Sequence, residues 1–270
     1  MDFTLKIYRK LLTTLKEGGF GFQTFEKFLE EPGERVVVLR HDVDLRQEYA
    51  HVMAQLEREI GISGTYFFRV VRGSYNVDVI RKIHGLEHEV GYHYETMDIA
   101  GRSIGRKGDY NKSDEHWERV IVAAWEEFKV NLHRLREIVP VRTAAMHGSP
   151  RSRFNNLDLW KRYDYKELGI IGEPYLDVDF SDVLYLTDTG RRWDGAAVSV
   201  RDRVDSGGAF EGLSFSHTRQ IIEAARNGDL PPRIMINVHP QRWTNKPMPW
   251  IRELVWQNIK NQVKRFLVKR

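Results

Sequence analysis

The chain contains no cysteine among its 270 residues, which excludes disulfides, thiolate metal ligands and cysteine nucleophiles. Any bound metal would therefore be held by imidazole and carboxylate groups. Long apolar runs are also absent, so we expect no transmembrane segment. Residues 1–6 lack the uninterrupted apolar core of a signal peptide, and we therefore expect a cytoplasmic location.

The composition is that of an ordinary soluble protein, with 41% hydrophobic and 30% charged residues. The net charge of +4 is mild. It suits a small anionic substrate and requires neither nucleic acid nor a membrane as partner, although peripheral membrane contact stays open. No repeat or linker is visible. We predict one domain over residues 1–270, with N-terminal helices in 1–34 and a C-terminal helix in 248–270 packing on it; no pattern fixes the oligomeric state.

Apolar strands and amphipathic helices alternate along the chain, which predicts a parallel sheet covered by helices. The helices are expected around the apolar residues of 5–15, 22–29, 45–60, 79–86, 113–139, 221–222 and 250–266. A polar loop is expected over 98–112. The expected strands are 36–39, 65–70, 90–94, 143–146, 169–171, 183–187, 196–200 and 234–238.

Two architectures fit this alternation, a β/α barrel and a doubly wound sheet. We favour the barrel, because acidic residues or histidines follow several strands that are far apart in the sequence. In β/α barrels the carboxyl ends of the strands form the active-site face. A doubly wound sheet would gather such groups at one switch point.

Asp42 and Asp44 follow the strand 36–39, and their spacing of two places them on the same side of an extended chain. Two neighbouring carboxylates repel each other unless a cation or a shared proton relieves the repulsion. They therefore suit a divalent metal, with one as ligand and the other as base. The alternative for Asp44 is a cap of the following helix, and His41 alone is typical of a packed histidine.

Three further strand ends carry histidines. His93 and Glu95 are two apart and can face one site, where imidazole and carboxylate suit zinc or manganese. His147 lies in a turn with Gly148, and His239 follows the last apolar strand. Each could be a packed or hydrogen-bonded histidine, but histidines at several strand ends favour one converging site.

The motifs Arg40-His41-Asp42-Val43-Asp44, residues 88–95 (HEVGYHYE) and His239-Pro240 resemble the ordered motifs of the polysaccharide deacetylase family. That family includes nodulation-type chitooligosaccharide deacetylases, and the His-Asp-Val-Asp motif resembles one of its subgroups. The resemblance covers about residues 36–243. It implies a distorted, incomplete β/α barrel and removal of an acetyl group from a sugar with a divalent metal. Zinc is favoured, with manganese, cobalt and nickel as alternatives.

The resemblance also implies roles for four residues. Asp42 corresponds to the general base and Asp44 to a metal ligand. His93 corresponds to the first metal histidine, and His239 to the histidine that protonates the leaving group.

The sequence departs from the family pattern at Met97, where a second metal histidine is usual. A thioether is a poor ligand for a hard or borderline cation. The third metal ligand is therefore expected from another strand end. His147 is preferred, because imidazole would replace imidazole, and Glu95 is the alternative.

Three other residues are candidates for substrate contact. Arg106 lies in the glycine-bearing segment 101–108, which lacks the Gly-Lys-Ser/Thr ending of a nucleotide-binding loop. It could contact a substrate phosphate or be a solvated loop charge. Trp193 could stack on a sugar or pack in the core, and Arg192 precedes it.

The function predicted from these residues is metal-dependent removal of an acetyl group from an N-acetylated sugar or glycan precursor. The precursor would be nucleotide- or lipid-linked, as one for surface polysaccharide synthesis would be. One alternative is a non-catalytic carbohydrate-binding relative that has lost full metal ligation, which Met97 makes credible. Another is a hydrolase of a different small amide on the same barrel.

Overall fold

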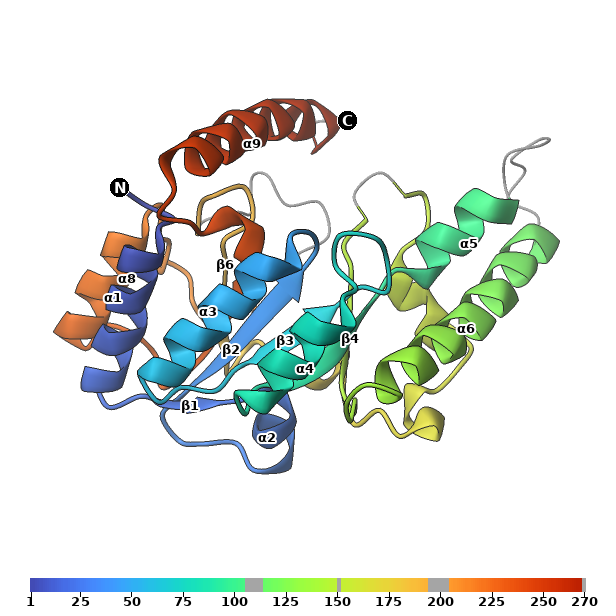
Figure 1. Cartoon of the computed structure of the whole chain (residues 1–270), viewed down its shortest axis with the longest axis horizontal. Coiled ribbons are helices and arrows are strands. Elements are labelled where there is room, and N and C mark those ends of the chain that lie inside the picture. The colour runs from blue at the N-terminus through green and yellow to red at the C-terminus, as the bar shows by residue number, and fades with distance from the viewer. Residues whose placement is uncertain (105–113, 150–151, 194–203, 269–270) are drawn as a thin grey trace.

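A computed structural model describes residues 1–104, 114–149, 152–193 and 204–268, which form one curved parallel sheet with helices around it (Figure 1). The strand order is β5-β4-β3-β2-β7-β6, and β1 pairs with the start of β2. Within the described residues no pairing joins β5 to β6, so the sheet is an incomplete barrel, as predicted. The strands are β1 (Gly21–Gln23), β2 (Val36–Val43), β3 (Thr65–Phe68), β4 (Glu89–Tyr94), β5 (Ala144–Met146), β6 (Leu184–Thr187) and β7 (Arg233–Val238).

Helices cover the outer face of this sheet. In Figure 1, α1 and α8 lie side by side at one end, α5 and α6 at the other, and α3 and α4 between them. The main helices are α1 (Leu5–Glu17), α2 (Phe25–Glu30), α3 (Gln47–Glu59), α4 (Val77–Gly85), α5 (Thr96–Ile104), α6 (Asp114–Arg136), α7 (Pro174–Asp177), α8 (Thr218–Asn227) and α9 (Pro247–Val268). No helix among the described residues is both long and apolar enough to cross a membrane.

The two faces of each strand have different neighbours, because successive side chains point to opposite sides. On β2, Leu39 and Val43 pack toward the outer helices. Val36 and Val38 instead join the inner cluster with Phe67 of β3. Helix α2 closes the end of the barrel where the strands begin, since its Phe25 and Phe28 belong to this inner cluster. The apolar filling thus occupies the lower part of the interior and leaves the carboxyl ends of the strands to polar side chains.

Three predicted elements differ from the structure. Residues 169–171 form no strand; a short 3-10 helix (Tyr165–Leu168) precedes an isolated bridge between Thr143 and Gly172. The loop predicted from residue 98 begins instead as α5, and Gly101 is needed there because a Cβ would come within 2.4 Å of the Phe154 ring. The short aromatic helix is preceded by strand β1. The strand predicted at 196–200 lies outside the described residues.

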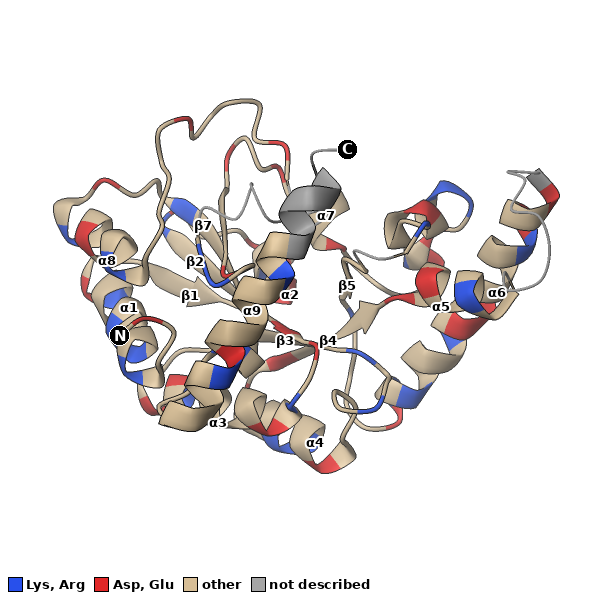
Figure 2. Cartoon of the chain, turned by 90° about the horizontal axis from the view of Figure 1, so that it is seen from above, with Lys and Arg blue, Asp and Glu red and all other residues tan. Residues whose placement is uncertain are grey.

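The C-terminal helix forms as predicted over most of its length, but part of its apolar face is exposed. We expected its apolar face to pack on the barrel, whereas Ile251, Val255 and Ile259 are exposed. Gln257, on the opposite face, is buried. Figures 1 and 2 show α9 lying apart from the outer helices, above the sheet.

Candidate active site

Polar side chains fill the inner positions where the strands end. In the sheet register Asp42 lies beside Phe67, and His93 lies beside Ala145. Because all strands are parallel, their carboxyl ends meet at one edge of the barrel. The residues that this edge brings together are Arg40, Asp42, Asp44, His93, Glu95, His147, Asn237 and His239.

Asp42 is buried and has a full set of hydrogen-bond donors. Arg40 contacts both carboxylate oxygens, with Nε–Oδ1 2.8 Å and Nη2–Oδ2 2.9 Å, and Asn237 Nδ2 donates to Oδ2 at 3.0 Å. Burial alone would raise the pKa of Asp42, but the charges of Arg40, His93 and His239 outweigh it and lower the pKa to about 2. Asp42 is therefore ionised at neutral pH and fixed in orientation.

Asp44 is not the cap of the helix that follows it. The residue at the start of α3 is Arg46, in the left-handed conformation at φ 55° and ψ 57°, and no side chain caps this helix. An Asp that caps a helix accepts from a backbone N–H in its first turn. The structure therefore removes the principal alternative to a ligand role for Asp44.

The carboxylate of Asp44 faces three histidines. Its Oδ1 lies 3.5 Å from His93 Nε2 and 3.6 Å from His147 Nε2, and its Oδ2 lies 3.9 Å from His239 Nε2. Oδ1 is buried and has no hydrogen-bond partner, whereas Oδ2 accepts a long bond from Gln241 at 3.4 Å. Burial would raise the pKa of Asp44, but the surrounding histidines hold it well below its usual value. Burying an ionised oxygen without a hydrogen-bond donor lowers the stability of the fold, so Asp44 Oδ1 lacks a partner that would offset its burial.

Hydrogen bonds fix the orientation of the two histidines nearest Asp44. His93 Nδ1 lies 2.9 Å from the Ala145 carbonyl, which can only accept, so Nδ1 carries the proton. His147 Nδ1 lies 3.0 Å from Ser149 Oγ and 3.2 Å from Glu95 Oε2. Both rings thus turn Nε2 toward Asp44. This is the arrangement in which a neutral histidine offers its second nitrogen to a metal.

Arg69 binds the carboxylate of Glu95. Arg69 Nη2 lies 2.6 and 2.7 Å from the two carboxylate oxygens, and its Nε lies 3.0 Å from Oε1. Arg69 Nη1 also donates to the Asp44 carbonyl at 3.3 Å. Burial would raise the pKa of Glu95, but the His147 hydrogen bond and the Arg69 charge lower it to about 2. Glu95 is placed to orient His147.

The donors suit a divalent cation, although they do not yet enclose one. Among the described residues no group of three His, Asp or Glu side chains would hold a metal ion as it stands. Two ligands at zinc distance on a tetrahedral ion lie roughly 3.4 Å apart. The separations of 3.5 and 3.6 Å around Asp44 Oδ1 are close to that value. The unpartnered oxygen of Asp44 and the two imidazole nitrogens that face it therefore have the chemistry of a divalent-metal ligand set.

Met97 takes no part in this centre. It is fully buried in the apolar cluster that α5 forms with the outer face of the sheet. A ligand at that position would face the wrong side of β4. His147, from the loop after β5, faces Asp44 instead, with Nε2 3.6 Å from Oδ1.

His239 lies on the other side of Asp44 and is held by a buried acid. Its Nδ1 lies 2.6 Å from Asp188 Oδ1, and its backbone N–H donates to Asp188 Oδ2 at 3.0 Å. Trp243 Nε1 and Arg242 also donate to Asp188. Burial and the Arg242 charge lower the pKa of His239, but the pairing with Asp188 outweighs them and the net effect is a raised pKa. His239 is therefore suited to carry a proton.

The three predicted substrate contacts have different outcomes. Trp193 is 4% exposed, stacks on Phe3 at 6.4 Å and donates from Nε1 to Thr218. The ring of Trp193 thus packs inside the protein, which is one of the two possibilities that the sequence left open. Arg192 is exposed. Arg106 lies outside the described residues.

Several site residues had no role in the sequence prediction. Arg40 and Asn237 contact Asp42, Asp188 and Arg242 support His239, and Arg69 supports Glu95. The alternation of a strand was a usable signal for Arg40 and Asn237, since each lies two residues before a predicted site residue. Arg69 carries no such signal, because it meets Glu95 through the pairing of β3 with β4, and the sequence alone does not show which strands are neighbours.

A second group of histidines lies on the outer side of β2, around the buried Glu57 of α3. Glu57 accepts hydrogen bonds from Tyr8 at 2.7 Å, His41 at 2.8 Å and Tyr66 at 2.9 Å. His88 Nδ1 lies 3.6 Å from the same carboxylate. His41 stacks on Tyr66 at 3.8 Å between ring centres. His41 is therefore a packed histidine, which is the expected role of a histidine taken alone.

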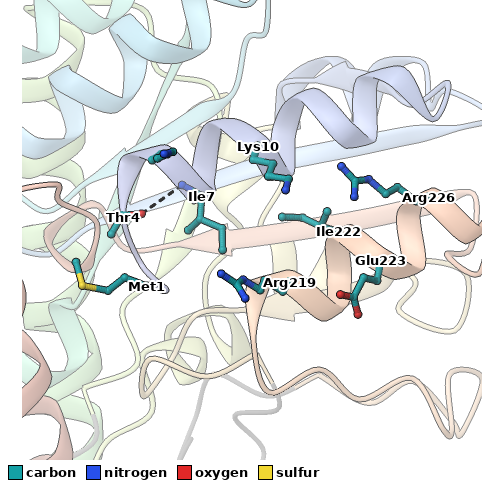
Figure 3. A pocket seen from close by; sticks show the side chains of 9 residues that line it. Met1, Thr4, Ile7, Lys10, Arg219, Ile222, Glu223 and Arg226 are labelled. Carbon is teal, nitrogen blue, oxygen red and sulfur yellow. Dashed lines mark hydrogen bonds between the residues drawn. The ribbon is translucent and has the colours of Figure 1, made fainter.

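A surface groove of about 440 Å³ lies between α1 and α8, away from the strand ends (Figure 3). Four cationic and three apolar side chains line it together with Thr4 and Glu223, and it contains none of the predicted site residues. The groove separates two outer helices. The chemistry-bearing groups remain those at the carboxyl ends of the strands.

No protein-family model and no curated protein sequence matches the chain. Similar solved structures include the Xyl-CE4 domain of a multidomain xylanase from the Trinervitermes trinervoides hindgut metagenome, with 14% identity over 85% of each chain and a TM-score of 0.39. A Streptococcus mutans CE4 esterase shows 11% identity over 88% of this chain and 85% of its own, with a TM-score of 0.43. A CE4 family pseudoenzyme from Bacillus anthracis shows 12% identity over 87% of this chain and 63% of its own, with a TM-score of 0.36. These likenesses concern the fold, and the function is argued from the side chains.

Proposed function

We propose that the chain is a metal-dependent hydrolase that removes an acetyl group from an N-acetylated sugar or glycan precursor. The observation that supports it most is the buried, unpartnered Oδ1 of Asp44, which faces His93 Nε2 and His147 Nε2 at 3.5 and 3.6 Å. The sugar substrate follows from the motif resemblance, and a nucleotide- or lipid-linked precursor is the form we favour.

Asp44, His93 and His147 would hold the cation, with zinc favoured over manganese, cobalt or nickel because two of the three ligands are imidazoles. When bound, such a cation polarises a carbonyl group and makes water a stronger acid. Glu95 supports this set by fixing His147, as carboxylates behind metal-ligating histidines generally do.

Asp42 would accept the proton of the attacking water. Its carboxylate is ionised, and the Arg40 and Asn237 donors keep it from turning toward the cation. Asp42 Oδ2 lies 3.8 Å from His93 Nε2, so it borders the same space as the ligand set. A satisfied carboxylate beside an unsatisfied one separates the base from the ligand.

His239 would deliver a proton to the departing nitrogen. Amide cleavage needs such a donor, because an amine leaves poorly without a proton. The Asp188 carboxylate fixes Nδ1 of His239 and leaves Nε2 directed toward Asp44 at 3.9 Å. The base and the acid therefore flank the ligand set.

The test compares Asp42→Asn with Asp44→Asn, using metal analysis of the purified protein and acetate release from acetylated chitooligosaccharides. Asp42→Asn should keep the metal and lose turnover, whereas Asp44→Asn should lose both. Asp229→Asn, at an exposed position, is the matched control and should behave as the parent chain.

Loss of metal in Asp42→Asn would show that the roles of the two aspartates are exchanged. A parent chain that releases no acetate with any divalent ion would overturn the proposal and favour the non-catalytic carbohydrate-binding alternative. Turnover of simple amides but not of acetylated sugars would move the substrate to another small amide.

A further inference from the structure

Helix α9 presents an apolar stripe to solvent. Ile251, Val255 and Ile259 recur every four residues, and they are 49%, 53% and 52% exposed. Met248 and Trp256 border the stripe and are also exposed. Exposed apolar side chains that gather on one helix face mark an interaction surface more often than scattered ones do.

The opposite face of α9, which carries Trp250, Gln257 and Asn261, contacts the rest of the protein. Asn261 Nδ2 donates to the Gly190 carbonyl at 2.9 Å, and the buried Gln257 donates to Asn261 at 3.1 Å. Near the start of the helix, Trp250 Nε1 donates to the Asp2 carbonyl at 2.8 Å. These bonds fix which face of α9 points outward, so the apolar stripe is exposed when the helix is packed on the rest of the protein.

The helix segment is also strongly basic. Residues 247–270 contain six Lys or Arg and one Glu, a net charge of +5. Since the whole chain has a net charge of +4, the remaining residues have a net charge of −1. The positive charge of the protein is thus concentrated in the segment that also exposes the apolar stripe.

We propose that α9 docks the protein on an anionic lipid surface, with its apolar stripe in the interface. A helix that combines an apolar face, a tryptophan and several cations lies in the plane of such a surface. Lys260 Nζ lies 5.3 Å from the Trp256 ring centre, so a cation and an interfacial aromatic ring already adjoin. Two copies of a segment with a net charge of +5 would repel each other, which favours the lipid over a second copy.

Docking in this way would turn the candidate active site toward the lipid. Gly190, which Asn261 contacts, follows the carboxyl end of β6, and the site lies at the carboxyl ends of the strands. Figure 1 shows α9 on the side toward which the β2 arrow points. A lipid-linked acetylated precursor would then reach the site from the surface; this last step rests on the proposed function.

The test is flotation of the full chain with phosphatidylcholine vesicles, with and without phosphatidylserine as one third of the lipid. We expect binding to the anionic vesicles about tenfold stronger than to neutral ones, and weaker as salt rises. The double variant Ile251→Ser, Val255→Ser should lose most of this binding. The control Val122→Ser, Val130→Ser changes two exposed valines of α6 and should bind like the parent.

Absence of vesicle binding by the parent chain, or unchanged binding by the α9 variant, would overturn the proposal. A concentration-dependent dimer in sedimentation that the α9 variant abolishes, without vesicle binding, would assign the stripe to a second copy. Acetate release from a soluble acetylated sugar, measured on the same variants, should not change. Failure of docking is thereby separated from failure of the proposed chemistry.

Discussion

A carboxylate lies beside histidines on each side of strand β2: Glu57 of α3 on the outer side and Asp44, just after the strand, on the inner side. The hydrogen bonding of the two carboxylates differs. On the outer face, Glu57 accepts three hydrogen bonds, from Tyr8, His41 and Tyr66. On the inner face, Asp44 faces three histidines but leaves Oδ1 without any donor. The outer group joins α1, α3 and the sheet, whereas the inner group joins only strand ends.

The comparison teaches that a histidine beside a carboxylate does not by itself identify a candidate metal ligand; a buried carboxylate oxygen left without a donor does, as at Asp44. A fully bonded buried acid stabilises the fold, because each donor offsets the loss of water. An unbonded one is retained at a cost in stability, and such a cost is typical of functional positions. Four experiments test whether the two faces differ in this way.

The largest expected effect is on activity, at the inner face. Asp44→Ala should lower acetate release about 10³-fold or more, since it removes a group around which the reacting atoms would be ordered. In metal-free buffer the same variant should unfold at the same or a higher urea concentration, because an unpaired buried oxygen is removed. A marked loss of metal-free stability would contradict the comparison.

The second effect is on stability, at the outer face. Glu57→Gln should lower the free energy of unfolding by about 3 kcal/mol, because it breaks a buried charged network. Zinc binding should not change. Glu59→Gln, on the same helix but exposed, is the control and should cost less than about 1 kcal/mol. Equal effects of the two substitutions would mean that the outer network is not a stabilising one.

A third effect concerns zinc affinity. Glu95→Gln should weaken zinc binding about 10- to 100-fold, because His147 loses the carboxylate that fixes its ring. The measurement is competition with a chromogenic chelator, and Glu126→Gln on the exposed side of α6 is the control. Unchanged affinity in Glu95→Gln would show that Ser149 alone orients His147.

The smallest effect is the pH dependence of stability contributed by His88 on the outer face. Burial lowers the pKa of His88, with Glu57 opposing the shift. The Gly64 N–H donates to Nδ1 of the neutral ring at 3.0 Å. A lowered folded pKa means that this contribution is complete above the unfolded value of about 6.5 and is lost as pH falls toward the folded value.

Urea unfolding should therefore show that the free energy of unfolding decreases as the pH is lowered from 7 to 5. This proton contributes at most about 1.4 kcal/mol per pH unit. His88→Gln should reduce the slope. The pKa of Glu57 is also lowered, because His41 and the other donors outweigh burial, and its contribution is lost only below about pH 4.3. A slope unchanged in His88→Gln would assign the pH dependence elsewhere.

Much of the fold could be predicted from the sequence, because strand and helix periods are local properties. The runs of β2 and β7 are continuous and apolar, as buried parallel strands require. The failures have local physical reasons. Gly101 in α5 permits close contact with Phe154, but a glycine in a sequence favours the prediction of a loop. Residues 169–171 have the composition of a strand but contribute only an adjoining bridge.

The candidate site could be predicted where residues lie at a strand end, but the contacts between residues from different strands could not. Asp42, Asp44 and His93 could be placed by alternation, and His147 and His239 by their position after a strand. The contact of Arg69 with Glu95 depends on the pairing of β3 with β4, which no local pattern contains. Likewise, the sequence left open whether Trp193 packs in the core, because its partners Phe3 and Trp243 come from opposite ends of the chain.

The alternation along β2 also limits how this stretch can change its length. Adding or deleting one residue between Val36 and Arg40 would leave the sequence of the motif unchanged but move each of its side chains to the opposite face of the sheet. His41 would then face the barrel interior, and Asp42 would enter the apolar layer beneath α3. Diverging copies of this protein should therefore vary the identity of residues 36–39 freely among apolar types, while the distance from the start of the strand to Asp44 stays constant.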